Sequence, residues 1–307
     1  MKLSVIIPVR EDARIRGCLE ALCRRQTSPK DEFEVVVVDD GPSEVVERIV
    51  SEFPARYVAE RGVGSYAARN HGIEEARGDL LAFTDADCVP SPRWIEEILL
   101  TFEDASCRIA VGPSYAANST AVALWTQSVD DTRWTALLAA ESATAFCDTR
   151  NLAARREVFA SERFDPAFRW AGDVELGFRL SARGQRIRLA PNMQVGHVNP
   201  TRLRDVLRRG IRRGKGLEQL YRKHGAQVRL GGERSVSVLG RDIKGPLLAL
   251  VCAPGFRTLS ILGLLPILGG LLAVLAALAR TREGGRTGAR LFGWFERLSL
   301  LLGRLLA

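Results

Sequence analysis

Two carboxylates follow a short apolar run in the first third of the chain. Leu80–Phe83 is apolar and has the length of a strand, and Asp85 and Asp87 come directly after it. Gly78 before the run and Pro90 after it favour a strand over a helix. Because ligands gather at the carboxyl ends of strands in open α/β sheets, this pair is placed to hold a divalent cation and, through it, phosphate oxygens. An isolated Asp-x-Asp more often marks a solvated turn or a helix cap, so the surrounding elements must carry the interpretation.

Acidic side chains also end a second strand-like run. Phe33–Val38 is rich in valine, which predicts a strand buried on both faces, and Asp39-Asp40-Gly41 follows it. The spacing of apolar residues predicts the remaining elements: strands at Leu3–Val9 and Arg56–Ala59, and helices at residues 15–22, 45–50, 66–76 and 91–102, the last with Ser91 as N-cap and Pro92 at its first position. This alternation predicts an α/β fold with a mostly parallel sheet flanked by helices.

One glycine-rich stretch has a competing interpretation. Gly62–Ala67 matches G-x-G-x-x-A, with acidic residues about 20 positions later, as in dinucleotide-binding folds. That fingerprint normally follows the first strand of a sheet, whereas here it follows the third. We therefore expect a loop that presents backbone N–H groups to a substrate, with Arg69 on the helix that follows.

The composition indicates an anionic partner and a reducing environment. The 307 residues are 46% hydrophobic and carry a formal net charge of +8, which leaves nucleic acid, an anionic membrane surface or a phosphorylated substrate as candidates. The six cysteines form no CxxC motif, which favours reduced thiols and a cytosolic face. Met1–Ser4 runs into the first strand without the apolar core of a signal peptide.

Four segments together resemble a known family. Val5–Val9, Val37–Gly41, Ala68–Ile73 and Ala82–Asp87, in this order, resemble the family 2 glycosyltransferases with the GT-A fold. The resemblance covers roughly residues 3–215. It implies a nucleoside-diphosphate sugar as donor substrate and Mn²⁺ or Mg²⁺ as cofactor.

The resemblance also implies roles for residues at the donor site. It assigns Pro8, Arg10 and Glu11 to the base and ribose, Asp40 to the base, Arg69 to the nucleotide, Asp85 to the ribose or metal, and Asp87 to the metal. Arg10-Glu11 stands where the family often has an aromatic residue and Asn, which leaves the base open. The family often has a His at the position of His197, where a neutral imidazole would complete the metal site for Mn²⁺. A structural role for this histidine is the alternative.

A second chemical site is expected at Asp173. The family usually has a Glu-Asp pair at the head of this helix, and Asp173 matches the Asp while Gly172 replaces the Glu. The resemblance implies that Asp173 is the general base that removes the proton of an acceptor hydroxyl, which suits a carboxylate at hydrogen-bond distance. The alternative role is a helix N-cap. We expect Glu175 to pair with Arg179 one helical turn later.

The C-terminal third combines basic and apolar segments. Residues 202–223 are rich in Lys and Arg but contain no nucleic-acid motif, so we expect no nucleic-acid partner. Arg209, Arg212 and Arg213 are expected to reach the diphosphate, and the remainder to meet anionic lipid. Residues 258–279 carry no charge and are long enough to span a bilayer, but a single span would place a basic tail on the far side. A re-entrant or interfacial hairpin with both ends cytoplasmic avoids this conflict and is the arrangement that we expect, with a single span as the alternative. The tail at 291–306 predicts an amphipathic helix on a membrane surface.

These features predict a catalytic domain at residues 1–200, a basic juxtamembrane segment at 201–244 and membrane-associated helices at 245–307. The expected protein is an inverting glycosyltransferase at the cytoplasmic face of the cell membrane, and its acceptor is a hydroxyl of a lipid-linked or cell-envelope glycan. Two alternatives remain. A polyprenyl-phosphate sugar synthase would need no base, and a catalytically silent membrane adaptor would bind the nucleotide sugar without turnover.

Overall fold

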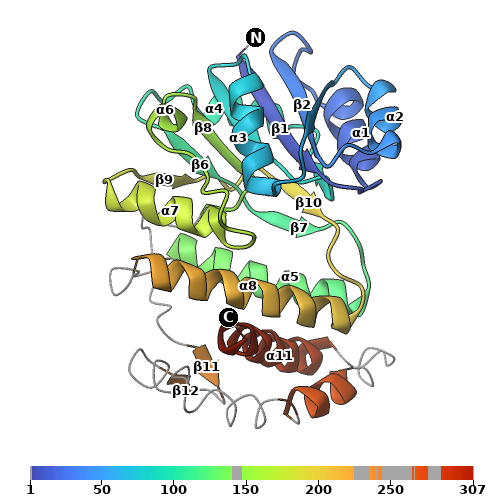
Figure 1. Cartoon of the computed structure of the whole chain (residues 1–307), viewed down its shortest axis with the longest axis vertical. Helices are drawn as coiled ribbons and strands as arrows, with labels where there is room; N and C mark the ends of the chain where they lie inside the picture. Colours follow the sequence, from blue (N-terminus) through green and yellow to red (C-terminus); the bar gives the residue numbers. More distant parts are fainter. Residues whose placement is uncertain are drawn as a thin grey trace. The chain divides into compact units, whose positions relative to one another are not determined.

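The computed structural model describes residues 2–139, 147–224, 236–238, 241–243, 265, 267–275 and 285–306. The chain forms two compact units. The first comprises Met1–Ala117 and Trp134–Val198, and the second comprises Asn118–Arg133 and Asn199–Ala307. Figure 1 shows the elements of both.

A seven-stranded sheet forms the centre of the first unit. Its order is β3(Arg56–Glu60), β2(Phe33–Asp40), β1(Leu3–Val9), β4(Leu80–Phe83), β8(Leu152–Arg155), β6(Ile109–Val111) and β9(Ile187–Leu189). All neighbours are parallel except those of β8, which is antiparallel to β4 and to β6. The sheet is therefore mostly parallel, as predicted, and the carboxyl ends of β1, β2 and β4 share one edge.

Helices cover both faces of this sheet because strand β1 is apolar on both sides (Figure 1). Alternate residues Leu3, Val5, Ile7 and Val9 belong to the same core cluster as the apolar face of α1(Ile15–Arg25). On the other face Ile6 lies so close to Gly72 of α3(Ser65–Glu75) that a Cβ there would come within 2.4 Å of its Cγ2. The other helices are α2(Glu44–Ser51), α4(Trp94–Thr101), α6(Val158–Ser161) and α7(Gly172–Ala182).

The predicted start of α4 was wrong. The helix begins at Trp94, two residues after Pro92, and the Trp94 amide donates to the carbonyl oxygen of Ser91. Arg93, which precedes the helix, has φ −99° and ψ 8° and lies outside helical geometry. The Ser-Pro pair therefore forms a turn that leads into the helix, and it does not cap the helix.

A smaller sheet begins directly after Asp87. Its order is β5(Cys88–Pro90), β10(Val195–His197) and β7(Ser114–Ala116). Strand β10 is antiparallel to β5 and parallel to β7. This sheet brings β10, a segment more than one hundred positions away in the sequence, beside the residues that follow β4.

The second unit is a helical assembly built on close packing. It contains α8(Leu203–His224), α11(Gly285–Leu305), the short strands β11(Val236–Val238) and β12(Arg241–Ile243), and the first part of α5(Ala121–Ala139). Helices α8 and α11 approach closely at Gly214, where a Cβ would lie 2.1 Å from the carbonyl oxygen of Leu300. Glycine on α8 is therefore what permits this distance.

The predicted helix at 291–306 is present, but its expected surface role needs correction. Phe292 and Phe295 are fully buried in a core cluster with Val206 of α8 and Trp125 of α5. The apolar face of α11 is thus covered by protein, where we expected a membrane surface. An amphipathic pattern shows that one face is buried but does not identify what buries it.

No helix among the described residues is long and apolar enough to cross a bilayer. Much of the predicted segment at 258–279 lies outside the described residues, and the parts that are described, residue 265 and residues 267–275, are helical. The choice between a span and a re-entrant hairpin therefore stays open, as do the predicted boundaries at residues 200 and 244.

Candidate active site

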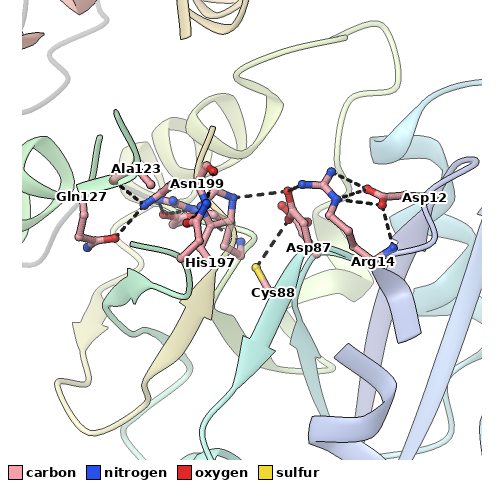
Figure 2. Close-up of polar contacts among 12 residues, drawn as sticks. Asp12, Arg14, Asp87, Cys88, Ala123, Gln127, His197 and Asn199 are labelled. Atoms are coloured by element: carbon pink, nitrogen blue, oxygen red, sulfur yellow. Dashed lines mark hydrogen bonds and ion pairs between the residues drawn. The ribbon is translucent and has the colours of Figure 1, made fainter. Parts of the chain in front are cut away.

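Asp87 is contacted by side chains from two other segments of the first unit. Its Oδ2 lies 3.2 Å from Nη1 of Arg14 and 3.6 Å from Nε2 of His197. Figure 2 shows Arg14 lying between Asp87 and Asp12, whose Oδ2 is 2.6 Å from Nη2. Asp12 thus holds the guanidinium group from the other side, and sequence reasoning had not singled out either Asp12 or Arg14.

His197 reaches Asp87 through strand pairing. In the register of β10 and β5, His197 lies opposite Cys88, the residue after Asp87. The amide of Val198 donates to the backbone carbonyl of Asp87 at 3.0 Å, which fixes the two segments beyond the strand ends. The imidazole is buried. Backbone hydrogen bonds between the two segments therefore hold His197 close to Asp87, as the predicted metal site requires.

Asp85 belongs to a different pair from Asp87. Its Oδ1 accepts a hydrogen bond from Nη2 of Arg69 at 2.5 Å, and Arg69 is almost fully buried at 4% exposure. Nη1 of Arg69 donates to the carbonyl oxygen of Ser65 at the start of α3. The helix that follows the glycine loop thus delivers a guanidinium group to the first carboxylate, while the second carboxylate faces His197.

The two carboxylates differ in their pKa values. Burial raises the pKa of Asp85, and the nearby charges of Asp87 and Asp148 add to this effect while Arg69 opposes it. Burial also acts to raise the pKa of Asp87, but His197, Arg14 and Arg150 outweigh it and leave the pKa below its ordinary value. The surroundings of Asp87 therefore favour its ionised form more than those of Asp85 do, which suits a cation ligand.

The donor set fits a divalent cation that is shared with a substrate. Among the residues that the structure describes, no three Asp, Glu, His or Cys side chains group into a metal site of their own. The three predicted ligands, Asp85, Asp87 and His197, accordingly do not converge on one point. Asp85 instead pairs with Arg69. Asp87 and His197 do converge, and Mn²⁺ or Mg²⁺ often takes one or two protein ligands and fills its other positions with phosphate oxygens and water.

The acidic end of β2 holds the glycine loop. Oδ1 of Asp40 accepts a hydrogen bond from the amide of Gly64 at 2.9 Å. Gly64 has φ +114° and Gly62 φ +75°, conformations that residues with a Cβ rarely adopt. Asp40 thus shapes the loop that leads to Arg69, in addition to its predicted position at the base.

Asp39 is a residue that sequence reasoning left without a role. It is fully buried, and its Oδ2 accepts hydrogen bonds from the amide of Ser43 and the hydroxyl of Tyr57, each at 3.0 Å. Its Oδ1 is buried with no hydrogen-bond partner among the described residues. A buried acceptor without a partner suits a ligand N–H group. The sequence did indicate a site here, because Asp39 and Asp40 follow a buried strand, but it did not show which of the two carboxylates faces the site.

The end of β1 supplies the remaining predicted donor contacts. Pro8 lies opposite Val38 of β2 and is buried, whereas Arg10 is exposed and its Nη1 lies 4.0 Å from Oδ2 of Asp40. Glu11 has φ +48°, a left-handed conformation that costs a non-glycine residue energy. Strain of this kind concentrates at functional sites.

Asp173 lies in the first turn of α7 and contacts α3. Its Oδ1 accepts hydrogen bonds from the hydroxyl of Tyr66 at 3.2 Å and from the amide of Val174 at 2.9 Å. The predicted pair of Glu175 and Arg179 is confirmed, with Nε of Arg179 2.9 Å from Oε1 of the fully buried Glu175. Asp173 is therefore the partly exposed acidic residue of this turn, whereas Glu175 is fully buried and has a structural role.

Arg209, Arg212 and Arg213 lie on α8, in the second unit. Arg209 lies near Glu296 of α11, with 3.9 Å between its Nη2 and the carboxylate Oε1. Their expected contact with a diphosphate stays a prediction.

Known glycosyltransferases resemble parts of this chain. It is 39% identical over 117 residues to glycosyltransferase AglE of Haloferax volcanii, which covers 36% of this chain and 38% of that protein. It is 28% identical over 235 residues to a pre-mycofactocin glycosyltransferase of Mycobacterium tuberculosis, covering 72% of this chain and 48% of that protein. The chain thus spans less than half the length of each of these relatives.

A solved structure shares the fold. The mannosyltransferase PcManGT from Pyrobaculum calidifontis, in complex with GDP-Man and Mn²⁺, superposes with a TM-score of 0.61 at 20% identity, covering 99% of this chain and 86% of that chain. The mostly parallel sheet flanked by helices fits the GT-A fold. The sequence model of glycosyl transferase family 2 matches residues 4–162, about half of the chain. This chain belongs to glycosyl transferase family 2.

Proposed function

We propose that this protein is an inverting, metal-dependent glycosyltransferase that moves a sugar from a nucleoside-diphosphate sugar to an acceptor hydroxyl. The observation that carries the proposal is the meeting of Asp87 and His197 at the carboxyl end of β4, with the ionised state of Asp87 favoured. Family membership supports glycosyl transfer, and the resemblance to PcManGT in complex with GDP-Man and Mn²⁺ supports this donor and cofactor class.

The donor site is assembled from three strand ends. Asp87 and His197 would hold the cation, which when bound neutralises negative charge on the leaving diphosphate. Arg69 would hold Asp85 toward the ribose. Asp39 or Asp40 would accept an N–H group of the base, and the glycine loop before α3 would present backbone N–H groups to the nucleotide.

Asp173 would act on the acceptor. A carboxylate within hydrogen-bond distance of the acceptor hydroxyl removes its proton as the oxygen attacks the anomeric carbon, and a single displacement inverts that centre. The acceptor that we propose is a lipid-linked or cell-envelope glycan. The alternative of a silent adaptor draws support from Gly172, which stands where the resembling family has Glu.

We also propose that the protein acts at the cytoplasmic face of the cell membrane. Arg204 and Arg208 on α8 are exposed, and so are Ile267 and Val274 in the second unit. Cationic and apolar side chains together favour an anionic lipid surface. Sedimentation with phosphatidylglycerol vesicles should exceed that with neutral phosphatidylcholine vesicles and fall with added salt or in Arg204→Glu/Arg208→Glu. Equal and salt-insensitive sedimentation with both vesicle types would contradict the electrostatic part of this proposal.

The proposed function is tested by calorimetric binding of UDP, GDP and dTDP, with and without Mn²⁺. We expect one nucleotide to bind most tightly and its binding to require Mn²⁺. The same nucleotide linked to different sugars then allows donor hydrolysis to be measured, which a silent adaptor would not perform. A folded protein that binds none of the three nucleotides would overturn the transferase proposal.

A further inference from the structure

Tyr66 links the glycine loop of the donor site to the carboxylate of Asp173. It lies in the first turn of α3 and is 7% exposed, and its hydroxyl donates to Oδ1 of Asp173 at 3.2 Å. Burial raises the pKa of the Tyr66 hydroxyl, and the charge of Asp173 adds to this, so the phenol keeps its proton and remains a donor. The contact joins residues 107 positions apart in the chain.

Gly172 makes this contact possible. A Cβ at residue 172 would lie 2.6 Å from Cε2 of the Tyr66 ring and within 2.9 Å of two further ring atoms. Real Cβ atoms do not approach other atoms this closely, so the ring occupies the volume that any side chain at 172 would need. The absence of a side chain at Gly172 is thus matched by the Tyr66 ring, which fills that volume.

The ring has little freedom to give way. It stacks on Phe164 with 5.7 Å between ring centroids, and the guanidinium carbon of Arg69 lies 5.4 Å from its centroid. Arg69 is in turn fixed by Asp85. Tyr66 is therefore held by Phe164 and by Arg69, the second of which belongs to the proposed donor site, and its hydroxyl has a defined position.

The backbone before Asp173 is also constrained. Ala171 has φ +60° and ψ 21°, a left-handed conformation that is strained for a residue other than glycine. This residue sets the direction from which α7 starts and so the place of Asp173. The backbone of this turn and the Tyr66 hydroxyl therefore both help to set the position of the carboxylate.

We propose that Tyr66 is the positioning residue for the general base Asp173, and that the lack of a side chain at Gly172 makes room for the Tyr66 ring. The hydroxyl fixes the carboxylate of Asp173 and favours its ionised form, which is the form that accepts the acceptor's proton. This inference rests on the proposed role of Asp173. It predicts that substitutions at residues 66 and 172 have non-additive effects on stability.

The first test compares Tyr66→Phe with Asp173→Asn and the double variant. Release of nucleoside diphosphate is measured with the donor selected by calorimetry, with water or an added glycoside as acceptor. Tyr66→Phe keeps the ring, so the Tm and the KM for donor should change little while kcat falls about tenfold, as expected for loss of a hydrogen bond to a charged group. In the Asp173→Asn background the same change should have no further effect.

The pH profile separates positioning from a merely structural role. Tyr66 faces Asp173 from α3, with Arg69 beside the phenol. Cys147 faces Asp173 from the segment before β8, with Asp148 and Arg179 near its thiol. Tyr66→Phe removes a donor to the ionised carboxylate, so the acidic limb of kcat/KM should move to higher pH. An unchanged kcat and pH profile, or an equal loss in the Asp173→Asn background, would overturn the inference. Full activity of Asp173→Asn would instead overturn the base itself.

A second test measures the packing of Gly172 against Tyr66 through the Tm and does not depend on enzyme activity. Gly172→Ala should lower the Tm because its Cβ meets the Tyr66 ring, and the Tm loss should shrink when Gly172→Ala is made in a Tyr66→Ala background. An equal loss of Tm in the two backgrounds would show that the residues are not coupled and would overturn the inference.

Discussion

Asp87→Asn should remove metal-dependent nucleotide binding while leaving the fold intact. The amide keeps the size of the carboxylate but loses its charge, and a hard cation prefers charged oxygen ligands. We expect nucleotide affinity in the presence of Mn²⁺ to fall at least about a hundredfold and kcat to fall about a thousandfold, the scale of losing a charge-stabilising group. The measurements are calorimetry with the nucleotide that the wild-type protein selects, and donor turnover.

Stability should respond little to this change, because the ion pair of Asp87 and Arg14 is half-exposed on the Arg14 side. Such pairs contribute about 1 kcal/mol or less. Arg14→Ala is the matched control. It removes a cation that competes for the same carboxylate, so Mn²⁺ should bind about two- to fivefold more tightly to this variant. If Asp87→Asn bound nucleotide as well as the wild-type protein does with Mn²⁺, Asp87 would not be a metal ligand.

Local patterns in the sequence predicted the parts of the site that lie on one element. The run Leu80–Phe83 is a strand with the predicted bounds, and acids follow it as expected, because apolar composition, length and flanking breakers act locally. The end of β2 was placed less well: the strand continues through Asp39 and Asp40 because these residues pair with Ala59 and Glu60 of β3. Pairing with β3 sets the end of β2, and this pairing cannot be inferred from the residues of β2 alone.

Contacts between distant segments were harder to foresee. The neighbourhood of His197 and Asp87 depends on the pairing of two three-residue strands, which have no distinct pattern of their own. The contact of Tyr66 with Asp173 depends on the absence of a side chain at residue 172, and Gly172 had been noted only as a departure from the family. Sequence reasoning thus named most of the residues that meet at the site, but it did not foresee the arginine that pairs with Asp87 or the tyrosine that pairs with Asp173.

Asp173→Asn separates the proposed reaction from its nearest alternative. With a hydroxyl acceptor, loss of a general base should lower kcat about 10²- to 10⁴-fold and leave the KM for the donor unchanged. A phosphate acceptor is already an anion and needs no base, so a polyprenyl-phosphate sugar synthase would keep much of its activity in this variant. The measurement is transfer to a glycoside and to a polyprenyl phosphate, each compared between the variant and the wild-type protein.

Glu175→Gln provides the contrast on the same helix turn. Glu175 is fully buried and paired with Arg179, so neutralising it should lower the Tm through an uncompensated buried charge while the folded fraction keeps its activity. Asp173→Asn should do the reverse, with a small change in Tm and a large loss of kcat. If Asp173→Asn lowered the Tm as Glu175→Gln does and kept its kcat, Asp173 would have a structural role only. The inverting mechanism would then have to find its base on another element.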